Sequence, residues 1–284
     1  MAILLNRGSV LEAVSRITCK SRQEWGYNLP MEWRILGSFG GSSPTCRMTS
    51  FLINGHLALD AGSITQALTL PEQRQIDRVV VTHSHLDHTA SIPFLVENTF
   101  SENHGGLEIL VTPQVMQTVK LHLFNNDTWP DFTRIPNDFL PALRLRQIEP
   151  RQRVAIDGLH LTPIPVHHIV PTHGYVVEDA DGAVIFTSDT GPTEEIWEVA
   201  NRTAGLKALI VEVSFPSRLQ AVADVSLHLT PTTLAAELAK LRRDIPVYLY
   251  HLKPSCLEEL REELAATRFP HRVEELRQDD VYCF

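Results

Sequence analysis

The sequence predicts an α/β protein in which two mixed β-sheets pack face to face, with helices on the outside. Two observations lead to this fold class. Short apolar runs typical of buried strands occur in both halves of the chain, and each half also contains helical segments. The 284 residues are 43% hydrophobic and 21% charged, without a biased tract, so the chain can bury a large core.

The chain is expected to form one domain preceded by an extension. Residues 1–32 lack a strand pattern and are predicted to be a loose or partly helical N-terminal extension, with a short helix at residues 10–17. From Trp33 the strand patterns begin, and no linker interrupts them. Residues 33–284 are therefore predicted to be a single domain.

A β-hairpin is the clearest local prediction in the N-terminal half. Residues 50–53 and 56–60 are separated by Asn54 and Gly55, a pair that suits a type I′ turn because both residues tolerate positive φ. Further strands are expected at residues 34–36, 78–81 and 108–111, and a helix at residues 114–123.

The C-terminal half repeats this mixture of strands and helices. Thr230 can cap a helix that starts at Pro231, a residue suited to the first helical position. Helices are expected at residues 194–201, 231–242 and 258–266. Strands are expected at residues 154–156, 160–161, 174–177, 184–186, 208–211 and 247–249.

Composition also limits the partners and the location of the protein. The net charge of −9 and the lack of a basic run disfavour tight binding of duplex nucleic acid or tRNA. No apolar run is long enough for a membrane span or a signal peptide core, so no membrane partner is expected. Four cysteines without CxxC spacing fit a reducing compartment, and we expect a cytoplasmic protein that is compatible with a homodimer.

A cluster of histidines follows the strand at residues 78–81. His83 and His85 project to the same side of an extended chain, and Asp87 and His88 follow as the chain turns. Imidazole and carboxylate are suitable donors for zinc and its neighbours, so four such side chains within six residues can reach two metal ions. The alternative, a surface cluster of histidines, does not explain their position after a continuous valine strand.

The motif HxHxDH formed by residues 83–88 is that of the metallo-β-lactamase superfamily, which the sequence resembles along most of its length. The resemblance implies a four-layer αββα sandwich. It also implies two groups of metal ligands that share a bridging carboxylate, with His167 and His173 as alternatives to His168. The implied ligands are His83, His85 and His168 for one ion, Asp87, His88 and His251 for the other, and Asp189 as the bridge.

The implied cofactors are two divalent metal ions, with zinc favoured and manganese or iron as alternatives. Two such ions about 3.5–4 Å apart lower the pKa of a shared water from 15.7 toward about 7 and stabilise charge on phosphoryl oxygens. The motif therefore indicates a metal-dependent hydrolase.

Between about residues 35 and 255 the sequence resembles the class II 3′,5′-cyclic nucleotide phosphodiesterases. The resemblance rests on HLDH at residues 85–88, HLTP at residues 228–231 and HLKP at residues 251–254, in that order. Thr89 departs from the aliphatic residue more common there. The resemblance implies a small-molecule substrate, cAMP or cGMP, which a metal-bridging hydroxide converts to the 5′-monophosphate.

The same resemblance implies roles for residues outside the ligand set. His228, Asp87 and Glu212 are the predicted catalytic residues: His228 would protonate the 3′ leaving oxygen, with Glu212 orienting it. The alternatives are a helix-capping role for His228 and a strand-end salt bridge for Glu212. Substrate contacts are predicted for Trp129, Phe132 and Lys253, with the alternatives that the two aromatic residues belong to the core and that Lys253 is solvated.

Two other functions are considered on the same scaffold. A tRNA 3′-processing endonuclease of the RNase Z type shares the ligands, but its tRNA-clamping arm is commonly inserted between the third histidine and the bridging aspartate. Asp189 follows His168 by only 21 positions, which is too short for such an arm. A lactone or β-lactam hydrolase, or a catalytically silent metal-binding protein, stays open because function resides in the site rather than the fold.

Overall fold

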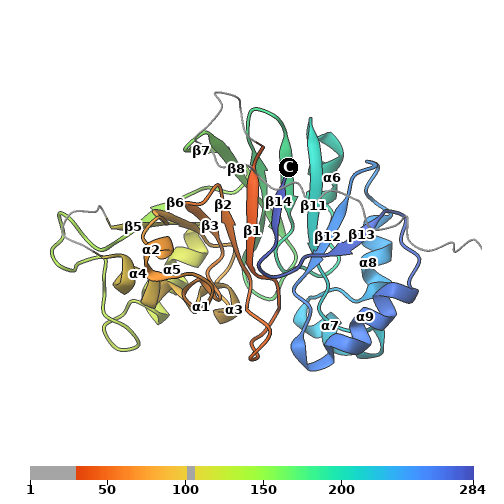
Figure 1. The fold of residues 1–284 in the computed structure, drawn as a ribbon, viewed down its shortest axis with the longest axis horizontal. Helices are drawn as coiled ribbons and strands as arrows, with labels where there is room; N and C mark the ends of the chain where they lie inside the picture. The colour runs from red at the N-terminus through yellow and green to blue at the C-terminus, as the bar shows by residue number, and fades with distance from the viewer. Residues whose placement is uncertain (1–29, 101–105) are drawn as a thin grey trace, which may run out of the picture.

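The computed structural model describes residues 30–100 and 106–284. Two seven-stranded sheets lie face to face at the centre of the molecule, with helices on both outer sides (Figure 1). The predicted four-layer αββα sandwich is therefore confirmed. The helix expected at residues 10–17 lies outside the described residues, and the domain boundary stays a prediction.

The first sheet has the order β14-β1-β2-β3-β4-β5-β6. Its pairs from β14 to β3 are antiparallel, and those from β3 to β6 are parallel. The strands are β14 (Val281–Cys283), β1 (Glu32–Gly37), β2 (Ser50–Ile53), β3 (Leu57–Leu59), β4 (Arg78–Val80), β5 (Leu107–Val111) and β6 (Leu143–Gln147).

The second sheet has the order β13-β12-β11-β10-β9-β8-β7 and the same mixture of pairings. Its pairs from β7 to β10 are antiparallel, and those from β10 to β13 are parallel. The strands are β13 (Val273–Glu275), β12 (Val247–Tyr250), β11 (Leu206–Glu212), β10 (Ala183–Phe186), β9 (Thr172–Glu178), β8 (Leu159–Val166) and β7 (Val154–Ile156).

The helices form the two outer layers. Those between residues 64 and 122 cover the first sheet, and those after residue 194 cover the second (Figure 1). The first set is α1 (Ile64–Ala67), α2 (Leu70–Gln73), α3 (Leu86–Thr89), α4 (Ile92–Thr99) and α5 (Pro113–His122). The second set is α6 (Glu195–Arg202), α7 (Gln220–Ser226), α8 (Pro231–Leu238) and α9 (Leu257–Ala266), with short 3₁₀ turns at Ser217–Leu219 and Pro254–Cys256.

The space between the sheets is filled by apolar side chains from both. The ring of Phe51 in β2 lies 5.2 Å from that of Phe186 in β10 and 5.7 Å from that of Tyr250 in β12. In β4, Val80 faces this central core, whereas Val79 packs in the cluster under the helices of the first sheet. Burial on both faces explains why this strand reads as a continuous valine run.

Most predicted elements are found close to their expected positions. Asn54 and Gly55 both have positive φ, as a type I′ turn requires, and Thr230 caps α8 by accepting from the backbone N–H of Thr233. The helix expected at residues 231–242 ends at Leu238. Strands β6, β13 and β14 were not expected, because each is a short edge or near-edge strand that is only partly buried.

The carboxyl ends of the parallel strands meet at one edge of the sandwich. Asp60 follows β3 and His83 follows β4 in the first sheet, while Asp189 follows β10 and His251 follows β12 in the second. Ligand sites in α/β sheets commonly lie outside such strand ends. Among the described residues, no helix has the length and apolar character needed to cross a bilayer.

Candidate metal centre

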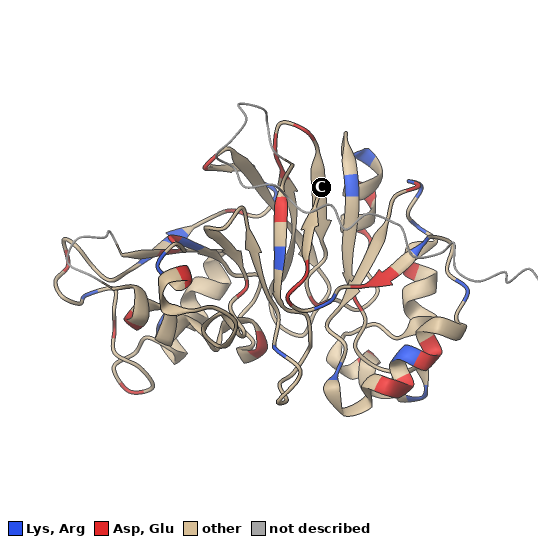
Figure 2. Cartoon of the chain, in the orientation of Figure 1, with Lys and Arg blue, Asp and Glu red and all other residues tan. Residues whose placement is uncertain are grey.

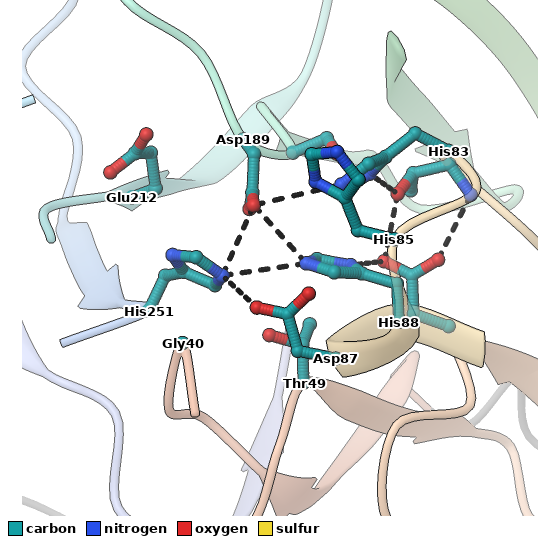
Figure 3. A network of polar contacts seen from close by, with 12 residues as sticks. Gly40, Thr49, His83, His85, Asp87, His88, Asp189, Glu212 and His251 are labelled. Atoms are coloured by element: carbon teal, nitrogen blue, oxygen red, sulfur yellow. Dashed lines mark hydrogen bonds and ion pairs between the residues drawn. The ribbon is translucent and has the colours of Figure 1, made fainter. Parts of the chain in front are cut away.

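All seven predicted ligands converge at this edge. Figure 3 labels His83, His85, Asp87, His88, Asp189 and His251 among them. They form two groups that share Asp189, and within each group the candidate ligand atoms lie within 4.8 Å of one another. The groups are His83, His85, His168 and Asp189, and Asp87, His88, Asp189 and His251. Neither His167 nor His173 belongs to a group: His167 Nδ1 lies 3.2 Å from the Pro192 carbonyl, and His173 Nδ1 lies 3.5 Å from Thr112 Oγ1.

Asp189 lies between the two groups. Its Oδ2 atom is 3.2 Å from His88 Nε2, 3.1 Å from His251 Nε2 and 3.7 Å from His83 Nε2. Asp189 is 1% exposed, and neither its Oδ2 nor His83 Nε2 has a hydrogen-bond partner. Two buried polar atoms without partners are costly unless another group satisfies them, and a pair of cations does so.

The first half of the chain holds His88 by a buried carboxylate. Asp60 Oδ2 lies 2.7 Å from His88 Nδ1, and both residues are fully buried. The backbone N–H of Thr82 donates to Asp60 Oδ1 at 2.9 Å, and the Thr82 hydroxyl donates to Oδ2 at 3.0 Å. A hydrogen bond at Nδ1 leaves the Nε2 lone pair of His88 for a metal ion.

In the second half of the chain, neutral groups hold the rings of the candidate ligands. His168 Nδ1 lies 3.0 Å from the carbonyl oxygen of Leu227, and His251 Nδ1 lies 2.9 Å from the hydroxyl of Ser214. His85 is oriented differently, because its Nδ1 atom lies 3.3 Å from His168 Nε2 and so faces the group itself. The ring nitrogens offered to the centre are therefore Nδ1 of His85 and Nε2 of the other histidines.

A glycine and strained backbone shape the position of His251. A Cβ atom at Gly40 would lie 2.6 Å from the His251 ring, so only glycine fits against it. His251 itself has φ of 70°, and Asp60 has φ of 57°, a left-handed conformation that is uncommon outside glycine. Such strain is typical of functional sites, where the surrounding structure enforces it.

The pKa values of His83 and His251 fit neutral imidazoles beside a charged carboxylate, whereas that of His88 favours the charged ring. Burial lowers the pKa of His83 well below its usual value, and burial lowers the pKa of His251 to about 4. Burial favours the protonated form of Asp189, but His251 and His88 together hold its pKa well below the usual value. Burial also opposes the charged form of His88, but Asp189 and Asp60 raise its pKa. Since metals bind neutral imidazole and ionised carboxylate, the donor set fits two divalent cations.

A glutamate–histidine pair lies beside the second group. His228 Nδ1 is 2.7 Å from Glu212 Oε1, and the His228 ring stacks on that of His251 at 5.2 Å. Burial lowers the pKa of His228, but the Glu212 carboxylate outweighs this effect, and the pKa lies above its usual value. The expected pairing of these two residues is thus present in the structure.

Of the three predicted substrate contacts, only Lys253 lies at the candidate metal centre. Trp129 and Phe132 pack against the cluster under the helices of the first sheet, and Trp129 also contacts Phe94 at 5.1 Å. These contacts favour the alternative that both are core aromatics. Lys253 donates to the Gly40 carbonyl at 2.7 Å, and its Nζ lies 3.7 Å from Asp87 Oδ2, so it lies at the centre.

Two residues of the site were missed by the sequence reasoning. Asp60 and Ser214 each contact a candidate ligand through its outer ring nitrogen. A signal for Asp60 existed: it directly follows β3, which pairs with β4 in a register that places Leu59 opposite Val80, so Asp60 lies at the strand end that leads into the histidine motif. Ser214 had no such signal, because a serine two residues beyond a strand is common.

The sequence profile of the β-lactamase superfamily domain matches residues 50–252. The chain belongs to the metallo-β-lactamase superfamily. Among curated relatives, a ribonuclease Z of Mycobacterium sp. (strain KMS) is 26% identical over 218 residues, which are 70% of this chain and 74% of that protein. Ribonuclease Z of Metallosphaera sedula is 22% identical over 54% of this chain, and endoribonuclease ysh1 of Schizosaccharomyces pombe is 25% identical over 42%. The chain spans 50% and 16% of those two relatives.

Solved structures of superfamily members share the fold over almost the whole chain. Yeast PDE1 is 19% identical with a TM-score of 0.73, and the match covers 90% of this chain and 100% of that one. The fold protein YhfI of Bacillus subtilis is 18% identical with a TM-score of 0.70, covering 90% and 99%. At these identities the matches show the fold, and the chain is a metallo-β-lactamase fold hydrolase with a cluster suited to metal binding.

Proposed function

We propose that the protein is a dinuclear metal-dependent phosphodiesterase that hydrolyses 3′,5′-cyclic nucleotides, cAMP and cGMP, to 5′-monophosphates. The observation that carries the proposal is the buried Glu212–His228 pair beside the two ligand groups that share Asp189. A proton donor at this position accelerates cleavage most when the leaving group is poor, as is the 3′ alkoxide of a nucleotide.

The residues of the chain divide the chemistry between them. The seven ligands would hold the two divalent ions, zinc in the first place and manganese or iron as alternatives. Such ions, when bound, supply a water of lowered pKa and stabilise charge on the phosphoryl oxygens.

Protonation of the leaving oxygen falls to His228. Glu212 holds Nδ1 of the ring, so Nε2 is the atom that can carry the transferable proton. Burial opposes the charged form of His228, but Glu212 raises its pKa above the usual value, which favours the protonated ring that a proton donor requires.

The short interval between His168 and Asp189 favours a small substrate over tRNA. Two strands, β9 and β10, occupy most of this interval, and Asp179 closes the turn between them by donating its N–H to the Gly182 carbonyl at 3.0 Å. This interval therefore holds a tight hairpin in place of the arm with which RNase Z enzymes clamp tRNA. Lys and Arg are dispersed over both halves of the cartoon rather than gathered at one place (Figure 2). Yeast PDE1 shares the fold along its full length, so the scaffold is compatible with the proposal.

A second candidate function is cleavage of precursor tRNA. It is favoured by the matches to ribonucleases Z, of which a mycobacterial one aligns with 70% of this chain. The geometry of the ligands does not separate the two candidates, since both reactions cleave a phosphodiester.

The test is a comparison of substrates with the zinc- or manganese-loaded full-length protein. We expect cAMP or cGMP to yield the 5′-monophosphate, with no cleavage of precursor tRNA and none of a lactone or a β-lactam. Asp189→Ala serves as the control for a contaminating phosphodiesterase. Cleavage of bis(p-nitrophenyl) phosphate without any cyclic nucleotide turnover would reject the substrate, and cleavage of precursor tRNA at low salt would favour the second candidate.

A further inference from the structure

Ser214 lies two residues beyond β11 and is fully buried beside the candidate metal centre. Its hydroxyl is 2.9 Å from Glu212 Oε2, 2.9 Å from His251 Nδ1 and 3.2 Å from His228 Nδ1. One hydroxyl therefore touches a carboxylate, a predicted metal ligand and the proposed proton donor.

The single proton of this hydroxyl can be placed from its surroundings. Glu212 Oε1 already accepts from His228 Nδ1 at 2.7 Å and from the Thr190 backbone N–H at 3.1 Å, whereas Ser214 is the partner of Oε2. The Glu212 carboxylate is the strongest acceptor near this hydroxyl. The other possible acceptor, the His251 carbonyl oxygen, lies farther away, at 3.4 Å. The Ser214 proton therefore points to Glu212.

The oxygen of Ser214 is then an acceptor toward the rings. It accepts from Nδ1–H of His251, which leaves the Nε2 lone pair of that ring for a metal ion. If the hydroxyl donated to His251 instead, the ring proton would move to Nε2, and His251 could not bind a metal ion. The direction of one hydrogen bond thus decides whether this histidine is a ligand.

We propose that Ser214 is a positioning residue whose hydroxyl connects the Glu212 carboxylate to Nδ1 of His251. Glu212 then sets the ring tautomer of the metal ligand His251 through Ser214 and of the proton donor His228 by direct contact. The role of His228 rests on the proposed function, whereas the connection from Glu212 to His251 does not. The close approach of Glu212, His228 and His251 is accordingly a hydrogen-bond network rather than a third metal site.

Glu212→Gln keeps the shape of the side chain but changes its hydrogen bonding. Because two N–H groups donate to Oε1, the amide must place its oxygen there and its NH₂ toward Ser214. That NH₂ would donate to Ser214, so the hydroxyl proton would lose its carboxylate acceptor. The acceptors left are His251 Nδ1 at 2.9 Å and the longer His251 carbonyl at 3.4 Å, and donation to Nδ1 gives the tautomer that cannot bind a metal ion. A residue that touches none of the seven ligands directly is thus expected to control metal binding.

The experiment measures zinc affinity and ring tautomers in the full-length protein. Ser214→Ala and Glu212→Gln should each weaken zinc binding by roughly 10–100-fold, the range found when a partner of a ligating histidine is lost. Ser214→Thr retains the hydroxyl and should stay close to wild type. In ¹⁵N-histidine spectra of the zinc-loaded wild type, His251 should be protonated at Nδ1 and should carry the metal at Nε2.

Ser38→Ala is the matched control. Ser38 is 2% exposed, and its hydroxyl donates to the Leu276 carbonyl at 3.3 Å, so this variant loses one buried hydrogen bond without changing the ring contacts. Its zinc affinity should be unchanged.

Three results would overturn the proposal. They are a zinc affinity of Glu212→Gln equal to wild type, a loss in Ser214→Ala no larger than in Ser38→Ala, and more than two zinc ions per chain held through Glu212. None of these measurements uses a substrate, so a wrong substrate assignment leaves them unaffected. If Ser214→Thr does not fold, the isosteric Glu212→Gln variant still decides the question.

Discussion

The two halves of the sandwich hold their metal-facing histidines in different ways. In the first half Asp60 contacts His88 directly, at 2.7 Å, within a fully buried pair. In the second half the Glu212 carboxylate reaches His251 only through the Ser214 hydroxyl, and it contacts His228 as well. Asp60 thus contacts one ring, whereas Glu212 contacts His228 directly and reaches His251 through Ser214. Under the proposed function, the second half would therefore couple metal binding to proton transfer.

Asp189 is the residue at which the two halves meet, and its removal should have the largest effect. Asp189→Ala removes the only carboxylate shared by both ligand groups, so it should lower both metal content and activity. Since loss of a partner of a ligand already costs about 10–100-fold in affinity, loss of the bridge should exceed about 100-fold. Elemental analysis of the purified variant and a turnover assay check this, and two tightly held ions in the variant would contradict the assignment of the bridge.

Removal of His228 should lower turnover without lowering metal content. His228→Ala should keep two metal ions but slow the cleavage of a nucleotide with an alkoxide leaving group by roughly 10²–10⁴-fold. With bis(p-nitrophenyl) phosphate the loss should be much smaller, because nitrophenolate leaves without a proton. Full activity of the variant on cyclic nucleotides would reject the role of proton donor.

The pH profile sharpens this second prediction. If His228 is the proton donor, its acid form is the active one; burial opposes this form, but Glu212 raises the pKa above its usual value. Turnover of the cyclic nucleotide should therefore show an alkaline limb, falling as the pH rises through this raised pKa and the ring loses its proton. His228→Ala should flatten this alkaline limb, whereas a limb that persists in the variant would belong to another group.

The same difference between the halves decided how far the sequence could predict the site. The ligands of the first half lie within residues 83–88, so local spacing was enough to find them. Those of the second half follow separate strands, and only the resemblance to a known family brought His168, Asp189 and His251 together. Ser214 could not be found at all, because its role depends on the direction of a hydrogen bond between distant strands. Trp129 and Phe132 were predicted to contact the substrate, but they pack against the core. A loop with aromatic residues has the same sequence pattern whether it binds a base or fills a core.

Asp60→Asn tests the direct contact of the first half. The Thr82 N–H donates to Oδ1, so the amide must turn its NH₂ toward His88 Nδ1, which forces the ring proton onto Nε2. Zinc affinity should fall by roughly 10–100-fold. Unlike Glu212→Gln, this variant should leave the ratio between alkoxide and nitrophenolate substrates unchanged at saturating metal. If Asp60→Asn changed this ratio as much as Glu212→Gln does, the two halves would not be separate in function. Asp77→Asn on the surface is the control.

The smallest effect is expected far from the centre, at Glu72 on the outer side of the first half. Its carboxylate accepts from Arg34 at 2.8 Å and from the Thr69 hydroxyl and backbone, and these hydrogen bonds lower its pKa from 4.5 to about 2. The resulting stability is present above pH 4.5 and is lost as the pH falls from 4.5 toward 2. Because the side chain is 40% exposed, solvent screening limits the contribution to about 1 kcal/mol or less. Glu72→Gln should therefore lower the melting temperature at pH 7 by roughly 2 °C, with a difference from wild type that shrinks at pH 3. Glu258→Gln, whose side chain is 84% exposed near Arg261, is the matched control, and an equal shift in that variant would show that Glu72 contributes nothing specific.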